Sequence, residues 1–289
     1  MLIPLNVAVP MQRWPYANWV LLGLLVAAFG LELGGSRATV MMYVLRDWSP
    51  LGIIGYMFLH AGVLHLVGNL IFLWAFGNAV CAKFNNLAFI PLFLLWGVCA
   101  AVVHLLFDGK PAVGASGAIN GVVGAYLILY PLNDISCLFF LFGVRVITIS
   151  GYWLILFWLA FDIWGAVAGR EGIAFMAHLG GFASGVAVTL LALKYGFITM
   201  DRAELSLVQV LVKMGLIRRR PAPVPPLDAA GPAAAAPDPG PPAPPVHAAR
   251  PATIVVQCLC GATIRAPAVH AGRNGRCPRC RATFKIPAA

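Results

Sequence analysis

Four polar side chains in an otherwise apolar chain are of the types that catalyse acyl transfer. Ser116 lies in the sequence VGASGAIN, and His178 lies in AHLGGFASG. His65 and Asn69 are four residues apart, which puts them on one face of a helix. A serine hydroxyl becomes a nucleophile when a base takes its proton, and a neutral imidazole suits that role near neutral pH. We therefore predict that Ser116 is a nucleophile and that His178 is its base.

The tetrahedral intermediate of such a reaction carries an oxyanion, which needs hydrogen-bond donors. The predicted donors are the backbone N–H of Ser116, at the start of a helix, and the side chains of His65 and Asn69. No carboxylate is expected beside His178, because Asp162 is predicted to lie deep in its own helix and the other nearby carboxylates lie in loops. The expected machinery is therefore a serine–histidine dyad.

Each of these residues also has a structural explanation when it is taken alone. A lone G-x-S-G sequence is more often a helix-packing surface than a nucleophile, and Gly180, Gly181 and Gly185 would form a second small-residue face. A histidine on such a face can simply bond a neighbouring carbonyl. The presence of a serine, a histidine and a His/Asn pair on three separate helices favours chemistry over packing.

The composition places these residues in a membrane. Hydrophobic residues make up 61% of the 289 residues and charged residues only 10%, whereas about 25% of a soluble protein is charged. The net charge is +10, but residues 1–193 hold seven Lys/Arg and six Asp/Glu, and residues 194–289 hold thirteen and four. The basic excess belongs to the tail, where Arg218–Arg220 suits a lipid surface, so nucleic-acid binding is not expected.

Six apolar stretches predict an all-α membrane domain over residues 1–200, a bundle of six transmembrane helices. Each is near the ~20 residues that cross a bilayer, and backbone in lipid must be internally hydrogen-bonded. They run approximately Tyr16 to Leu33, Val63 to Val80, Leu87 to Phe107, Gly117 to Leu132, Tyr152 to Ala168, and Ile173 to Leu193. The apolar run Cys137–Ile149 is too short to span, and is either an interfacial strand or the foot of the fifth helix.

The distribution of Lys and Arg predicts the orientation of this bundle. It places both termini in the cytoplasm, so the second, fourth and sixth stretches begin on the outer side and carry the polar residues near the outer leaflet. The expected location is a multi-pass position in a membrane. No cleavable signal peptide is expected before the first stretch.

The tail predicts three further segments. Residues 201–220 are basic, and residues 221–252 are rich in Pro and Ala and are expected to form a disordered linker. Residues 253–289 contain Cys258, Cys260, Cys277 and Cys280, a spacing that indicates a small zinc-ribbon-like domain with structural Zn²⁺. Disulfides or a redox C-x-x-C are the alternatives, which a cytoplasmic location disfavours. No cofactor is expected for catalysis.

Three motifs in order carry a family resemblance: HAGVLHLVGNLIFLWAFG (60–77), GASGAINGVVGAYLILYP (114–131) and AHLGGFASG (177–185). Together they resemble the bacterial rhomboid intramembrane serine proteases over about residues 15–195. The resemblance implies cleavage of transmembrane protein substrates near their outer ends, within membrane lipid, and a location in the inner membrane of a bacterium. It implies that Ser116 is the nucleophile, His178 the base, His65 and Asn69 the oxyanion-side residues, and His60 a histidine at the cavity mouth.

The sequence also departs from the family pattern and leaves other functions open. Asn120 stands where some members have an aromatic residue that stacks on the catalytic histidine, and the loop at 36–56 has no obvious match. One alternative is a catalytically inactive rhomboid-like protein that binds client transmembrane helices. A transporter or channel is a second alternative, against which the lack of a buried charge pathway beyond Asp162 counts.

Overall fold

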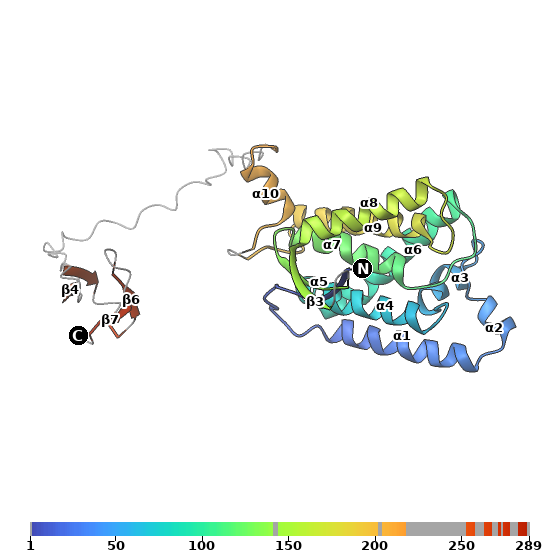
Figure 1. Ribbon diagram of the computed structural model, residues 1–289, viewed down its shortest axis with the longest axis horizontal. Helices are drawn as coiled ribbons and strands as arrows, with labels where there is room; N and C mark the ends of the chain where they lie inside the picture. Colours follow the sequence, from blue (N-terminus) through green and yellow to red (C-terminus); the bar gives the residue numbers. More distant parts are fainter. Residues whose placement is uncertain are drawn as a thin grey trace, which may run out of the picture. The chain divides into compact units, whose positions relative to one another are not determined.

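The chain divides into two compact units, residues 1–220 and 221–289 (Figure 1). The computed structural model describes residues 2–140, 144–201, 204–217, 253–257, 263–267, 271–272, 274–277 and 283–287. The predicted linker at 221–252 and the basic residues Arg218–Arg220 lie outside the described residues. The predicted boundaries of the four segments therefore stay predictions.

Long helices that run side by side make up most of the first unit (Figure 1). In the described part of the chain, four helices are long and apolar enough to cross a membrane. They are α1 (Tyr16–Gly34), the continuous helix Val63–Phe84, α6 (Asn86–Phe107) and α9 (Phe175–Lys194). The second of these consists of α4 (Val63–Phe72), the π-helical turn η2 (Leu73–Gly77) and α5 (Asn78–Phe84).

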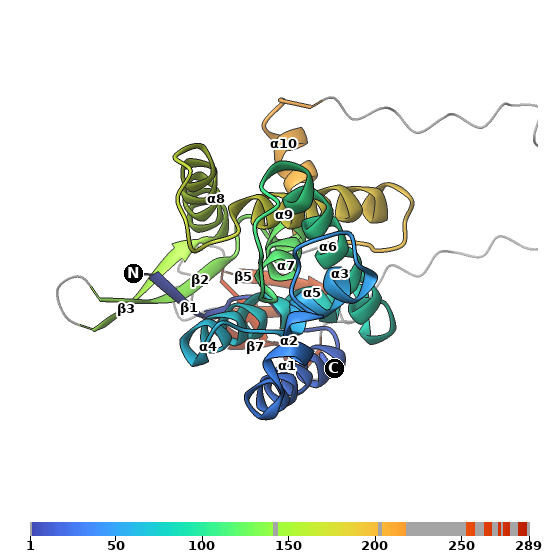
Figure 2. The ribbon, with the colours of Figure 1, turned by 90° about the vertical axis from the view of Figure 1, so that its right-hand side faces the viewer.

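The two remaining apolar stretches form shorter helices, α7 (Ser116–Leu129, 14 residues) and α8 (Gly151–Val167, 17 residues). Helix α7 lies in the middle of the bundle (Figure 2), and 12 of its 14 residues are buried. A helix enclosed by its neighbours need not match the thickness of the lipid. All six predicted stretches are therefore helical, while the prediction that six of them span the bilayer rests on sequence.

Helices α7 and α9 pack with their backbones in direct contact. A Cβ atom on Gly181 would collide with the carbonyl oxygen of Gly117, and one on Gly185 would collide with that of Gly121. A Cβ atom on Gly124 would likewise lie too close to a backbone oxygen, that of Phe182. The glycines that the sequence suggested as packing surfaces do serve packing, and they hold the starts of α7 and α9 at a short separation.

This close approach predicts a large effect of a single methyl group. We expect Gly185→Ala to lower the free energy of unfolding by about 3 kcal/mol or more, because backbone rather than a flexible side chain blocks the new Cβ atom. Gly30→Ala in α1 is the matched control, since no atom lies within 4 Å of the added Cβ there. Thermal unfolding of the purified variants in detergent measures both. Equal stability of the two variants would contradict this packing.

A three-stranded sheet corrects the expectation of an all-α chain. Strands β1 (Leu2–Val7), β2 (Asp134–Phe139) and β3 (Arg145–Ser150) pair antiparallel in the order β1-β2-β3. Within the run Cys137–Ile149, residues 137–139 belong to β2 and residues 145–149 to β3, whereas α8 begins at Gly151, so these residues are strand rather than the foot of α8. Ile135 and Cys137 are fully buried on one face of β2, so the alternation of this segment reflects burial of one sheet face.

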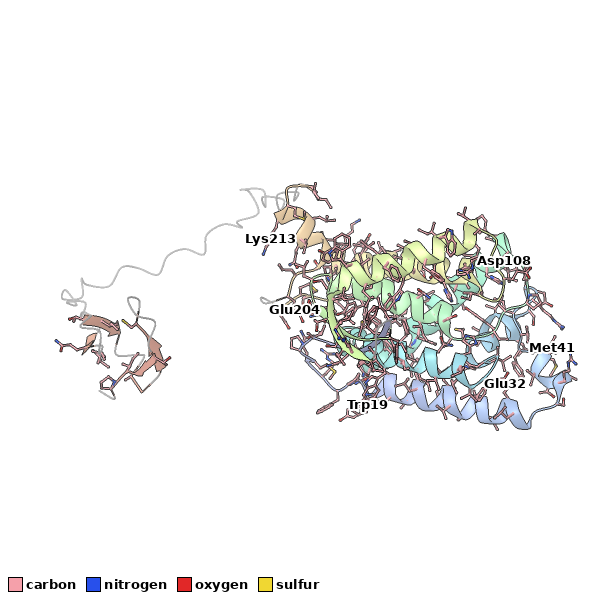
Figure 3. The ribbon with its side chains drawn as sticks, viewed as in Figure 1. Trp19, Glu32, Met41, Asp108, Glu204 and Lys213 are labelled. Atoms are coloured by element: carbon pink, nitrogen blue, oxygen red, sulfur yellow. The ribbon has the colours of Figure 1, made fainter. Side chains whose placement is uncertain are left out.

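Different residues and short elements lie at the two ends of the first unit (Figure 3). Glu32, Met41 and Asp108 lie at one end, which also carries the short elements α2 (Arg37–Met41), α3 (Pro50–Gly55) and η1 (Tyr56–Phe58). Trp19 and Glu204 lie at the opposite end. There Lys83 Nζ contacts Glu204 Oε2 at 2.5 Å in a buried ion pair, which attaches the segment before α10 (Leu207–Lys213) to the end of α5.

The second unit contains two hairpins in its described residues. Strands β4 (Thr253–Gln257) and β5 (Thr263–Pro267) form one antiparallel pair, and β6 (Asn274–Arg276) and β7 (Thr283–Lys285) form the other. Of the four predicted metal ligands, only Cys277 is described, with a side chain that is 1% exposed. Cys258, Cys260 and Cys280 lie outside the described residues.

Candidate active site

Ser116 is the first residue of the central helix α7, and the segment that begins at Asp108 leads to it from the end of α6. The preceding Gly114 has a φ of +123°, and its N–H donates to the carbonyl of Tyr56 at 2.8 Å. A Cβ atom at Gly114 would lie 2.6 Å from Cε1 of His65. Only glycine satisfies both the backbone conformation and the close approach, so the segment before Ser116 passes directly against His65.

His178 lies beside Ser116, as predicted. It is three residues after the first residue of α9, and its Nε2 lies 2.9 Å from Ser116 Oγ. The ring is also bounded by Phe175, whose ring centroid is 6.4 Å away in an edge-to-face arrangement. The two side chains predicted to form a nucleophile and its base are therefore within hydrogen-bonding distance, 62 residues apart in the chain.

The expectation that no carboxylate lies beside His178 is wrong. Both carboxylate oxygens of Asp162 lie 3.2 Å from Nδ1 of His178. Asp162 is only five residues before the end of α8 at Val167, and a short loop leads from there to the start of α9. Both side chains therefore lie about one turn from the same end of the bundle. The sequence-based prediction placed Asp162 deep in its helix. Its closeness to the end of α8 is what brings it to His178.

His65 and Asn69 project from α4 into the same cavity as Ser116 and His178. This cavity has a volume of about 480 Å³, and these four residues are part of its lining. The side-chain nitrogen of Asn69 is buried and has no hydrogen-bond partner among the described residues. His65 accepts a long hydrogen bond from Ala61 N–H through Nδ1, at 3.4 Å. Asn69 Nδ2 is thus a free donor at the wall of the cavity.

His60 is placed differently from the prediction. It is 2% exposed and packs its ring edge-on against His65 at 5.3 Å, so it lies behind that residue rather than at the open mouth of the cavity. Its backbone N–H donates to Glu32 Oε2 at 3.0 Å. Burial, followed by the nearby charge of His65, lowers the pKa of His60 to about 4. His60 is therefore neutral at neutral pH, and it supports His65 from behind.

The structure has two polar contacts near Ser116 that the sequence did not predict. The side chain of Asn120 donates to the carbonyl oxygen of Ser116 at 3.0 Å, one turn along α7. The hydroxyl of Tyr56 donates to the carbonyl of Gly97 at 2.8 Å, which anchors Tyr56 and hence its bond to Gly114. Asn120 thus bonds the backbone of its own helix and leaves the orientation of His178 to Asp162 and Phe175.

The comparison with known proteins decides the family. A sequence model described as the rhomboid domain matches residues 47–195, which is more than half of the chain. The chain belongs to the rhomboid family. The matched residues include all of the elements that carry the cavity, and the helices that meet the length needed to cross a membrane make the rhomboid domain an integral membrane domain.

Named relatives come from both bacteria and mitochondria. Rhomboid protein 1, mitochondrial, of Saccharomyces cerevisiae is 33% identical over 183 residues, which cover 58% of this chain and 51% of that protein. Rhomboid protease GluP of Bacillus subtilis is 38% identical over 69 residues, covering 24% and 14%. Rhomboid protease GlpG of Klebsiella pneumoniae is 24% identical over 185 residues, covering 62% and 64%. The chain spans about half or less of the first two relatives' length.

Proposed function

We propose that this rhomboid domain is an intramembrane serine endopeptidase that cleaves transmembrane segments of other membrane proteins near their outer ends. The observation that carries the proposal is the 2.9 Å contact between Ser116 Oγ and His178 Nε2 at the wall of a cavity. The names of two relatives, rhomboid proteases GluP and GlpG, support it. A location in the bacterial inner membrane stays a prediction from the resemblance to bacterial members, since the named relatives include mitochondrial proteins.

The geometry suits acyl transfer to Ser116. His178 takes the proton from Ser116 Oγ as that oxygen bonds the carbonyl carbon of the scissile peptide. The oxyanion that forms accepts hydrogen bonds from the backbone N–H of Ser116 and from Asn69 Nδ2. His65 is the third donor, through its Nε2–H. The proton on His178 then passes to the leaving amine, and water cleaves the acyl-enzyme by the same steps in reverse order.

The substrate must unwind before this reaction. Amides inside a helix are hydrogen-bonded to one another and shielded by side chains, so Ser116 reaches only an extended segment. Ser116 is the first residue of α7, and the Lys/Arg distribution predicts that this helix begins on the outer side of the membrane. We therefore propose that the cleaved bond lies near the end of the substrate helix, where small or helix-breaking residues favour an extended conformation.

Labelling by a serine-directed fluorophosphonate tests this function. We expect the wild-type protein to be labelled, and Ser116→Ala to lose all labelling. Ser184→Ala is the matched control and should keep it, because Ser184 Oγ donates to the backbone carbonyl of Gly181. A folded wild-type protein that resists the reagent would favour the inactive alternative, which binds client helices without cleaving them.

We also propose that the second unit binds one structural Zn²⁺. β4 ends at Gln257, directly before Cys258, and β6 ends at Arg276, directly before Cys277, so each cysteine pair follows the first strand of a hairpin. Two cysteine pairs at these positions in the sequence fit the ligand set of a zinc ribbon. When bound, the metal would crosslink the two hairpins, and Cys258, Cys260, Cys277 and Cys280 would hold it.

The zinc proposal predicts separate behaviour of the two units. Metal analysis of the full chain should find about one Zn²⁺ per chain, and Cys277→Ser should lose it while fluorophosphonate labelling persists. A chain truncated after Arg220 should cleave a transmembrane substrate at nearly the wild-type rate, because the cavity-lining residues in the described part of the chain all lie between Ala61 and His178. Absence of zinc would contradict the metal site, and loss of cleavage in a folded truncated chain would contradict the independence of the units.

A further inference from the structure

Asp162 is an unusual residue for its position. It is the only charged residue of α8, whose other side chains are apolar or aromatic, and its side chain is 13% exposed. In the described part of the chain, its only polar partner is Nδ1 of His178, at 3.2 Å from both carboxylate oxygens. An ionised group in an apolar, membrane-spanning environment is costly, and such groups are usually retained for function.

A purely structural role accounts poorly for this contact. Backbone contacts between glycines already hold α9 against α7, and α8 packs its apolar residues on the same bundle. An apolar side chain at position 162 would fill the same place without the cost of burying a charge. The carboxylate is also aimed at the one imidazole nitrogen that does not face Ser116.

We propose that Asp162 is a positioning residue that acts on Ser116 through His178, which makes the site a triad; this inference rests on the proposed protease function. A carboxylate accepts a hydrogen bond, so it selects the tautomer of His178 that carries its proton on Nδ1. Nε2 is then left as the acceptor toward Ser116 Oγ. Of the two tautomers, only this one can take the serine proton.

The carboxylate also stabilises the charge that develops during the reaction. As the Oγ–H bond of Ser116 breaks and the Nε2–H bond of His178 forms, the imidazole gains a positive charge. Asp162 faces that charge through the Nδ1–H bond, and the Nδ1 proton stays on His178 throughout. The side chain of Asn120 is engaged with the Ser116 carbonyl, so it does not take over this role.

A small cavity beside the pair offers a direct way to test the role of the carboxylate. It has a volume of about 150 Å³ and is lined by Asp162, His178 and Asn120 among others. Truncation of Asp162 to alanine enlarges this space. A small carboxylate such as formate can then occupy it and accept the hydrogen bond from His178 in place of the lost side chain.

The experiment compares full-length variants on a single-span membrane substrate in detergent. We expect Asp162→Asn to lower kcat by about 10² to 10⁴-fold and to slow fluorophosphonate labelling in parallel, with KM within about threefold of wild type. Formate should raise kcat of Asp162→Ala at least about tenfold, and chloride at equal ionic strength should not. Glu171→Gln is the matched control and should keep wild-type kinetics, because that carboxylate is 83% exposed and its ion-pair partner in the described part of the chain is Lys110.

Three outcomes separate this inference from the function on which it rests. If Asp162→Asn keeps kcat within about threefold while Ser116→Ala is inactive, the protease function stands and the inference is overturned. If neither wild type nor any variant cleaves or is labelled, the proposed function itself fails. If Asp162→Asn does not fold, Asp162→Ala with and without formate decides, since a residue needed only for packing gives no formate-dependent gain in kcat.

Discussion

Ser116→Ala and His178→Ala should each reduce cleavage by about 10⁴-fold or more, and the double variant should be no slower than either single variant. The two side chains act in one proton transfer, so removal of either one removes the whole nucleophile. The 2.9 Å contact between Oγ and Nε2 is the basis of this expectation. Initial rates on a purified single-span substrate measure all three variants, and losses that multiply in the double variant would contradict a shared step.

Ser184→Ala and Thr189→Ala are suitable controls for these two substitutions. Both residues lie on α9, as His178 does, and their hydroxyl groups donate to backbone carbonyls of that helix at 2.7 Å. Loss of such an intrahelical bond should change stability slightly and leave the rate constant for cleavage unchanged. A general sensitivity of α9 to substitution would instead lower the rate in all of these variants.

Asn69→Ala should lower kcat by about 10 to 10³-fold while the protein stays folded. Its buried side-chain nitrogen has no partner among the described residues, so no native hydrogen bond is lost, and the donor becomes engaged only when the oxyanion forms. An interaction made only in the transition state changes kcat more than KM. Steady-state kinetics together with thermal unfolding measure both effects.

Asn133→Ala is the matched asparagine control for this prediction. The side chain of Asn133 donates to the carbonyl of Ala8 at 2.7 Å, next to the sheet and away from the cavity. That variant should lose some stability and keep kcat. If Asn69→Ala behaves in the same way, with lower stability and unchanged kcat, then Asn69 is a packing residue and the oxyanion is stabilised by other donors.

The sequence was most informative where apolar length and residue type act locally. Stretches of about 20 apolar residues predict helices because lipid requires internally bonded backbone, and all six predicted stretches are helical. The approach of Ser116 to His178 was also predictable, because each lies at the start of a helix in a chain whose helices alternate in direction. Glycines on both helices allow the backbone contact that brings them together.

The parts that sequence reasoning missed depend on contacts between distant segments. Strand β1 pairs with β2, more than 120 residues away, and residues 2–7 alone carry no sign of that partner. The contact of Asp162 with His178 depends on where α8 ends and on how short its connection to α9 is. The burial of His60 depends on Glu32 in α1 and on His65, which together hold its loop against the bundle.

Cleavage of a panel of single-span membrane proteins is the measurement that tests the proposed protease most directly. The panel should vary the residues near the outer end of the span, and each member should be reconstituted with wild type or with Ser116→Ala in lipid vesicles. Mass spectrometry of the products should find new termini within the outer part of the span, for wild type only. Equal fragments with both proteins, or cleavage confined to regions outside the membrane, would contradict the account.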